Sequence, residues 1–273
     1  HKFRCVLSLS TPWGINASGV RQEYILIELL MFNKVCPRRA SGLQWAFRLH
    51  LAATIFFKKG PLTLMFDSII LDIDGTLWNS TPIVSEAWNK ALSTRPDITY
   101  RFTPERLTRL FGLPMDEIAA RSLPSLEPAD RNALMELCYE EEERFLAAST
   151  KDLLYPGVAD TIRTLSGICP LFIVSNCQSG YIELFLEKTG LGPCITDFEC
   201  PGSTGLGKGQ NIRLVMERNH LSKSIYVGDI EKDHKAATEA GIPFCHAAYG
   251  FGSADRPDYV IQKFPELLTL FHR

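Results

Sequence analysis

The chain has 273 residues, of which 45% are hydrophobic and 22% are charged. A chain of this size and composition can bury a substantial core, in one large globular domain or two modest ones. The formal net charge of −2 gives no reason to expect nucleic acid as a partner. No apolar run reaches the roughly 20 residues that cross a bilayer, so we expect no membrane partner either.

The first 64 residues differ from the rest in charge. They carry nine Lys or Arg residues against two acids, and they show no clean helical or strand period before Met65. We expect residues 1–64 to be an extension that is not part of the folded domain. A transit peptide or an extra helix remains an alternative; Lys58 and Lys59 follow the apolar run without a small-residue cleavage site, which argues against a signal peptide.

From Met65 onward, short apolar runs alternate with helical stretches, a pattern typical of an α/β fold with a parallel sheet. The expected strands are residues 68–72, 170–176, 224–229 and 243–248. Three of these runs end in polar residues, namely Asp72, the pair Ser175 and Asn176, and Asp229. Ligands bind at the carboxyl edge of open parallel sheets, so we expect these side chains to converge there.

Residues 81–150 show a different sequence pattern. Helical periods dominate, above all in residues 128–149, and no strand-like alternation interrupts them. We therefore predict a helical insert between the first and second strands. We interpret the acidic run from Glu140 to Glu143 within it as a solvated helix face rather than a metal site.

The eight cysteines are scattered, with no C-x-x-C pair and no histidine partner at zinc-ligand spacing. Free thiols in a reducing cytoplasm are the simplest interpretation.

Four short motifs occur in a fixed order between residues 66 and 250. They are "DIDGT" (72–76), "SN" (175–176), a single lysine in "GLGKGQN" (205–211) and "GDIEKD" (228–233). This set resembles the signature motifs of the haloacid dehalogenase (HAD) superfamily, in particular its phosphatase branch. The resemblance implies a Rossmann-like core made of residues 65–80 and 151–273, with residues 81–150 as an α-helical cap similar to that of phosphoglycolate phosphatase-like members.

The resemblance also implies roles for individual residues. Asp72 would attack phosphorus to form an aspartyl-phosphate, Asp74 would protonate the leaving alcohol and then activate water, and Lys208 would neutralise charge. Mg²⁺, which prefers oxygen ligands, would be held by the carboxylates of Asp72 and Asp229 and by the backbone carbonyl of Asp74. Asp233 would belong to the same metal site and orient a metal-bound water or Lys208. The residues implied in substrate binding are Gly75, Thr76, Ser175, Asn176 and Lys208.

Taken singly, these residues have structural explanations. Asp74 could support a turn at Gly75, Asp229 could cap a helix, and the Ser-Asn pair could form a turn or a helix cap. Lys208 is followed by Gly and Gln, so the glycine-rich stretch does not match a nucleotide-binding P-loop.

The resulting prediction is a Mg²⁺-dependent phosphatase that acts on a small phosphate monoester, as a monomer or weak homodimer. An acid at position 74 favours an alcohol leaving group, which needs a proton, over a halide. Alternatives are a sugar phosphomutase of the same superfamily and a catalytically silent relative that binds phosphate or a protein. Phosphoglycolate, sugar phosphates and nucleoside monophosphates all remain open as substrates.

Overall fold

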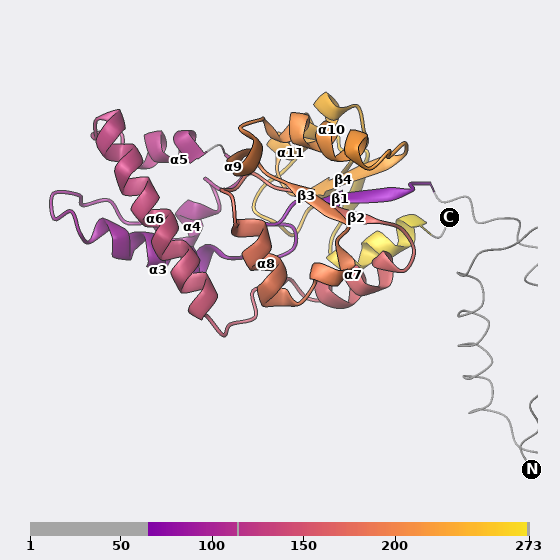
Figure 1. Cartoon of the computed structure of the whole chain (residues 1–273), viewed down its shortest axis with the longest axis horizontal. Helices are drawn as coiled ribbons and strands as arrows, with labels where there is room; N and C mark the ends of the chain where they lie inside the picture. Colours follow the sequence, from indigo (N-terminus) through magenta and orange to yellow (C-terminus); the bar gives the residue numbers. More distant parts are fainter. Residues whose placement is uncertain (1–64, 114, 272–273) are drawn as a thin grey trace, which may run out of the picture. The chain divides into compact units, whose positions relative to one another are not determined.

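The computed structural model describes residues 65–113 and 115–271 (Figure 1). The expectations for residues 1–64 fall outside this range. No helix in the described part of the chain is both long and apolar enough to cross a membrane.

A parallel sheet forms the centre of the described structure, as the sequence predicted. Its strands have the spatial order β3-β2-β1-β4-β5-β6, with every neighbouring pair parallel. The strands are β1 (Ser68–Leu71), β2 (Leu171–Val174), β3 (Asp197–Glu199), β4 (Ser224–Gly228), β5 (Phe244–Ala247) and β6 (Tyr259–Ile261). The four predicted strands are confirmed, and they are the four central ones.

The two edge strands, β3 and β6, were missed. Each is three residues long, and "DFE" and "YVI" are too short to show a period. Neither is fully buried, so neither has the continuous apolar run that marks the central strands.

Side-chain alternation along β1 divides the core between the two faces of the sheet. Ile69 and Leu71 pack in one apolar cluster, whereas Ile70 packs in the other. The helices α10 (Lys208–Arg218) and α11 (Glu231–Ala240) cover the Ile70 face. The opposite face is covered by α7 (Val158–Ser166), α8 (Tyr181–Thr189) and the 3₁₀ helix η2 (Phe264–Phe271), as Figure 1 shows.

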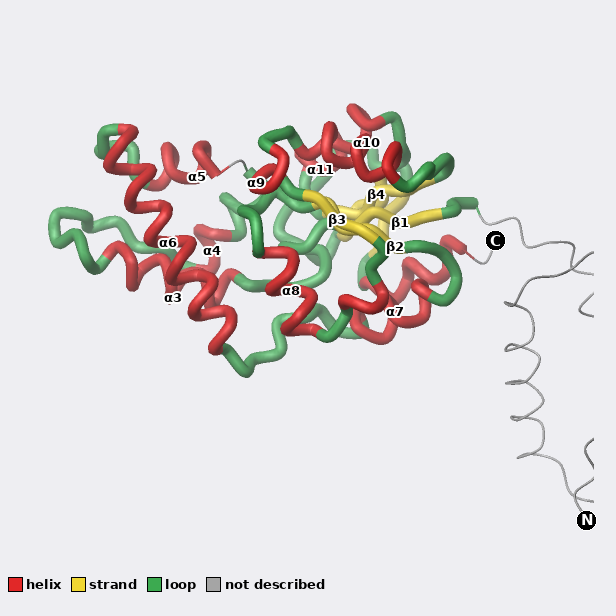
Figure 2. The backbone as a smooth tube through the Cα atoms, viewed as in Figure 1, coloured by secondary structure: helices red, strands yellow, loops and turns green. Residues whose placement is uncertain are grey.

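Between β1 and α7 the chain forms helices without adding a strand to the sheet. They are α3 (Thr81–Leu92), α4 (Pro104–Leu107), α5 (Met115–Ser122) and α6 (Pro128–Ala148), drawn in red to one side of the sheet in Figure 2. The predicted helix at 128–149 corresponds to α6. We call α3 to α6 the helical insert. Two smaller helices, η1 (Gly192–Cys194) and α9 (Pro201–Thr204), flank β3.

The polar contacts that join the helical insert to the rest of the described structure include one from the loop after β2 and one from α11. The Asn176 side-chain amide, just after β2, donates a hydrogen bond to the Gly112 carbonyl at 2.9 Å. Lys232 of α11 forms an ion pair with Glu117 of α5 at 2.6 Å. Both contacts lie at the carboxyl edge of the sheet, so they hold the insert over that edge.

Candidate active site

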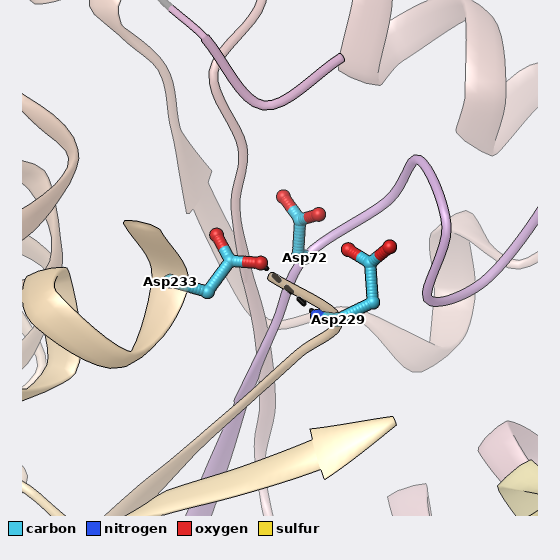
Figure 3. Close-up of side chains that lie close together, drawn as sticks. All are labelled: Asp72, Asp229 and Asp233. Atoms are coloured by element: carbon cyan, nitrogen blue, oxygen red, sulfur yellow. Dashed lines mark hydrogen bonds between the residues drawn. The ribbon is translucent and has the colours of Figure 1, made fainter. Parts of the chain in front are cut away.

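Three buried carboxylates meet at the carboxyl edge of the sheet (Figure 3). Asp72 directly follows β1, Asp229 directly follows β4, and Asp233 lies in the first turn of α11. Because β1 and β4 are neighbouring parallel strands, their ends bring Asp72 and Asp229 together. One carboxylate oxygen from each of the three residues lies within 4.8 Å of the others. The convergence expected from the sequence therefore extends to Asp233.

Lys208, the first residue of α10, supplies a positive charge to this cluster. Its Nζ atom donates hydrogen bonds to Asp72 Oδ1 at 2.9 Å and to Asp233 Oδ1 at 2.6 Å. Burial alone would lower the pKa of Lys208, but the two carboxylates outweigh it and hold that pKa well above its ordinary value. Lys208 is therefore a fixed cation within the acid cluster.

Asp233 has both carboxylate oxygens engaged within the protein. Oδ1 accepts the bond from Lys208, while Oδ2 accepts from the backbone N–H groups of Asp229 at 3.0 Å and Ile230 at 3.2 Å. Helix α11 begins after Ile230, and the side chain of Asp229 does not cap it. Asp233 thus orients both the lysine and the loop that presents Asp229.

The acid cluster carries more negative charge than Lys208 can balance. Burial raises the pKa of Asp72 to about 7, although Lys208 opposes the shift. Burial, followed by the charges of Asp233 and Asp72, also raises the pKa of Asp229 well above its ordinary value. A buried set of hard oxygen donors with excess negative charge fits a divalent cation such as Mg²⁺.

The Asp74 side chain has different surroundings from Asp72. Its Oδ1 atom accepts hydrogen bonds from Ser80 Oγ at 2.6 Å, Tyr181 Oη at 2.9 Å and Trp78 Nε1 at 3.0 Å. Burial raises the pKa of Asp74 to about 6, and these three neutral donors limit the rise. A carboxyl group with a pKa near 6 can exchange protons at neutral pH.

Gly75 and Thr76 complete the loop after β1. Gly75 has a φ of +84°, and a Cβ atom there would lie 2.1 Å from Asp229 Oδ2. Glycine is therefore needed both for the left-handed conformation and for the space that Asp229 occupies. The Thr76 hydroxyl is buried with no hydrogen-bond partner among the described residues. A buried hydroxyl without a partner needs an explanation, and a bound ligand is one that the sequence motif suggests.

Ser175 and Asn176 follow β2 and line the same cleft as Asp72. The Ser175 hydroxyl hydrogen-bonds to Asp72 and helps to lower the pKa of that carboxyl. The Asn176 amide is bonded to Gly112, so in this structure it also links the two parts of the fold.

The helical insert provides the opposite wall of this cleft. The insert residues on that wall are Trp88, Phe111, Gly112, Met115, Ile118 and Glu142. The expectation of a solvated face is wrong for Glu142, which is only 4% exposed, whereas Glu140 and Glu143 on the same helix are exposed. A run of four acids does not reveal which member faces inward, because that depends on how α6 packs against α3.

Sequence reasoning did not find the residues that hold Asp74. The structure shows that Trp78 Nε1 donates to Asp74. Ser80 and Tyr181 carried no signal, because a serine before a helix and a tyrosine at a helix start are common without a catalytic role.

Comparison with known proteins assigns the family. The model of the family described as "Haloacid dehalogenase-like hydrolase" matches residues 69–247. The chain belongs to this family, as its motifs predicted. The match covers all four motifs and the helical insert.

Curated relatives give a more specific identification. The chain is 28% identical over 222 residues to a phosphoglycolate phosphatase of Photobacterium profundum, covering 74% of this chain and 94% of the relative. It is also 28% identical over 211 residues to one of Synechococcus elongatus, covering 74% and 95%. With these relatives and its family, the chain is identified as an enzyme of the phosphatase branch.

Solved structures agree on the fold. A predicted phosphoglycolate phosphatase from Haemophilus somnus superposes with a TM-score of 0.68 at 20% identity, covering 76% of this chain and 99% of that one. A predicted phosphatase from Clostridium acetobutylicum has a TM-score of 0.63 at 19% identity, covering 75% and 97%.

Proposed function

We propose that this enzyme hydrolyses a small phosphate monoester through an aspartyl-phosphate on Asp72, with Mg²⁺ as cofactor. The observation that carries the proposal is the contrast between two carboxyl groups two residues apart. Asp72 is bonded to a lysine ammonium inside an acid cluster, whereas Asp74 is bonded only to neutral donors. The first environment suits a nucleophile, and the second suits a proton donor and acceptor.

In the first half-reaction, an Asp72 carboxylate oxygen forms a bond to phosphorus while the bond from phosphorus to the ester oxygen breaks. Lys208 and Ser175 both favour the ionised form of Asp72. The Asp74 carboxyl group gives its proton to the departing ester oxygen, which leaves as an alcohol. In the second half-reaction, Asp74 takes a proton from a water molecule that attacks the aspartyl-phosphate, and inorganic phosphate leaves.

The carboxylates of Asp72 and Asp229, together with the backbone carbonyl of Asp74, would hold Mg²⁺, and Asp233 would position Asp229 and Lys208. The bound ion would neutralise the charge of the phosphate dianion, which otherwise repels a carboxylate nucleophile. Both oxygens of Asp233 already accept hydrogen bonds, which supports a positioning role for this residue.

Phosphate oxygens would be bound by the loop after β1 and the residues after β2. The unpartnered hydroxyl of Thr76 supports its role as a donor, together with Ser175, Asn176 and the backbone at Gly75. Lys208, which donates to Asp72, would add positive charge.

Residues 81–150 would act as a cap over a core formed by residues 65–80 and 151–273. The lining of the cleft from both parts supports this division. Such a cap limits the size of the leaving group and excludes water. The six cysteines in the described residues are all free thiols, which is compatible with a reducing cytoplasm as the site of action.

Release of inorganic phosphate from small esters tests the proposal. The full chain is assayed with Mg²⁺ and with chelator, beside Asp72→Asn and the control Asp255→Asn, which changes an exposed acid. We expect turnover that disappears with chelator and in Asp72→Asn and persists in the control. Phosphoglycolate belongs in the panel, because the relatives are named for it.

The same assay separates the alternatives. Phosphorus NMR of the products would show a new phosphate ester if the enzyme were a mutase, and inorganic phosphate if it is a phosphatase. A folded wild-type protein that releases no phosphate from any ester would overturn the proposal and favour a binding protein.

A further inference from the structure

We propose that Glu142 contacts the leaving group and selects phosphate esters whose alcohol carries a second hydrogen-bond donor, a hydroxyl or an amine, over esters whose alcohol carries a carboxylate. The inference rests on the phosphatase function proposed above and specifies its substrate class.

The position of Glu142 is the first argument. It is a buried residue of α6, and it lines the same cleft as Asp72 and Asp74. Asp72 and Asp74 lie at the sheet edge, and Glu142 lies on the wall formed by the helical insert. A phosphate bound at Asp72 would therefore have its leaving group between the sheet edge and this wall.

The hydrogen bonds of Glu142 leave it able to bind a ligand. Trp88 Nε1 donates to Glu142 Oε2 at 2.6 Å, and the Gln178 side chain also hydrogen-bonds to this carboxyl group. Two donors do not saturate this carboxyl group, which keeps further acceptor capacity even when it is protonated. These two bonds fix the side-chain orientation, and the remaining acceptor positions are available to a donor in the cleft.

The charge of the cleft gives the direction of selection. Its lining includes three acidic residues, Asp72, Asp74 and Glu142, and no lysine or arginine among the described residues. Lys208, which donates to Asp72, does not line the cleft and is also hydrogen-bonded to Asp233. A leaving group with a carboxylate would add another negative charge to this acid-lined cleft, where low polarity makes repulsion between charges strong. An ammonium group would instead favour the ionised form of Glu142 and pair with it, and a hydroxyl group would donate to a free acceptor position of its carboxyl group.

A purely structural role for Glu142 is the competing explanation. Glu142 joins α6 to Trp88 of α3, and these helices pack along each other. A neutral glutamine could make the same link, since its amide oxygen accepts from the indole N–H. Burying a carboxyl group between neutral donors costs free energy, and burial raises its pKa to about 8. A link between helices does not require that cost.

Four matched esters test the proposal with the full chain and Mg²⁺. Phosphoethanolamine carries an amine, glycerol phosphate carries hydroxyls, phosphoglycolate carries a carboxylate and ethyl phosphate carries none of these. We expect kcat/KM for the first two to exceed that for phosphoglycolate by about tenfold or more, which is the scale of one buried charge-assisted contact. Wild-type protein that prefers phosphoglycolate, or does not distinguish it from the donor esters, would overturn the inference without affecting the phosphatase proposal.

Glu142→Gln tests whether this residue is responsible. It removes the ability to ionise and keeps the shape, so the ratio of phosphoethanolamine to phosphoglycolate turnover should fall about tenfold, mainly through KM. Glu143→Gln, an exposed neighbour on α6, is the matched control and should keep the wild-type ratio. Measuring both esters in one mixture makes the ratio independent of the folded fraction. An unchanged ratio in Glu142→Gln would assign Glu142 to structure alone, and absence of turnover of every ester by the wild type would instead contradict the phosphatase proposal.

Discussion

Lys208 Nζ lies 2.9 Å from Asp72 Oδ1, although 136 residues separate them in the chain. Asp72 is carried by the end of β1, whereas Lys208 starts a helix on one face of the sheet. The pair is almost completely buried, and the same ammonium also bonds to Asp233. One cation thus stabilises two acids that would otherwise repel each other.

Replacing Lys208 with methionine should damage both stability and catalysis. Removal of the ammonium leaves two buried carboxylates without their cation, so the free energy of unfolding should fall by about 3 kcal/mol. Phosphate release should fall by about 100-fold or more. Urea unfolding and steady-state kinetics measure the two effects. Lys235→Met, on the exposed side of α11, should change neither, and a Lys208→Met enzyme with wild-type turnover would contradict the role of this lysine.

The space around Gly75 gives a second prediction. A methyl group there would meet the Asp229 carboxylate at 2.1 Å, and the φ of +84° adds strain of about 1–2 kcal/mol. Gly75→Ala should therefore displace Asp229, lower stability and abolish most Mg²⁺-dependent turnover. Gly190→Ala is the matched control: its φ is +64°, but no atom lies within 4 Å of the added methyl group. Gly190→Ala should lower stability and leave Mg²⁺-dependent turnover unchanged. Equal activity of the two variants would show that the clash has no catalytic consequence.

The central part of the fold was predictable because its strands are fully buried. Buried parallel strands read as continuous apolar runs, so β1, β2, β4 and β5 stand out. The ends of three of these runs then indicate where polar side chains gather. The edge strands lack this signal because they are short and partly exposed.

The helical insert was harder to interpret from the sequence. Its helices are periodic, but their mutual packing decides which of four consecutive acids is buried, and a single sequence does not contain that geometry. The hydrogen bond from Trp88 to Glu142 joins residues 54 positions apart, so only the folded structure relates them. The residues around Asp74 were missed for the same reason, since Tyr181 lies 107 positions away.

Removing the Asp74 carboxyl group should separate the two half-reactions. A nitrophenyl ester has a good leaving group that needs no proton, so Asp74→Asn should still be phosphorylated by it on Asp72. The second half-reaction lacks its base and should slow by about 100-fold or more. Stopped-flow assays should then show a burst of nitrophenol followed by slow turnover, whereas an alkyl ester should give no burst. Equal effects on both esters would argue against Asp74 as the proton donor.

Tyr181 should tune the pH dependence of the first half-reaction. The acid form of Asp74 is needed for proton donation, so kcat/KM for an alkyl ester should fall as pH rises above about 6. The Tyr181 hydroxyl lowers the pKa of Asp74 by donating to its carboxylate, so Tyr181→Phe should raise that pKa. The alkaline limb of the profile should move to higher pH, by roughly half a unit to one unit. The substrate titrates identically in both enzymes, so the difference between their profiles reports on Asp74. A shift to lower pH would contradict the assignment.

The buried carboxyl of Glu142 should make stability depend on pH. Burial raises its pKa to about 8 in the folded protein, far above the ordinary value that applies to the unfolded chain. At a pH below that ordinary value, Glu142 is protonated in both the folded and the unfolded state, so its ionisation does not lower the free energy of unfolding. As pH rises, the unfolded chain ionises first, so stability is lost progressively until about pH 8. Relative to Glu142→Gln, the wild type should lose about 4 kcal/mol between pH 5 and pH 8, measured by urea unfolding at each pH. Glu143→Gln, which changes an exposed side chain, should follow the wild type at both pH values. The prediction fails if the difference in free energy of unfolding between the wild type and Glu142→Gln does not widen with pH. Glu142 would then be ionised in the folded protein at neutral pH, because its hydrogen bonds to Trp88 and Gln178 outweigh the effect of burial on its pKa.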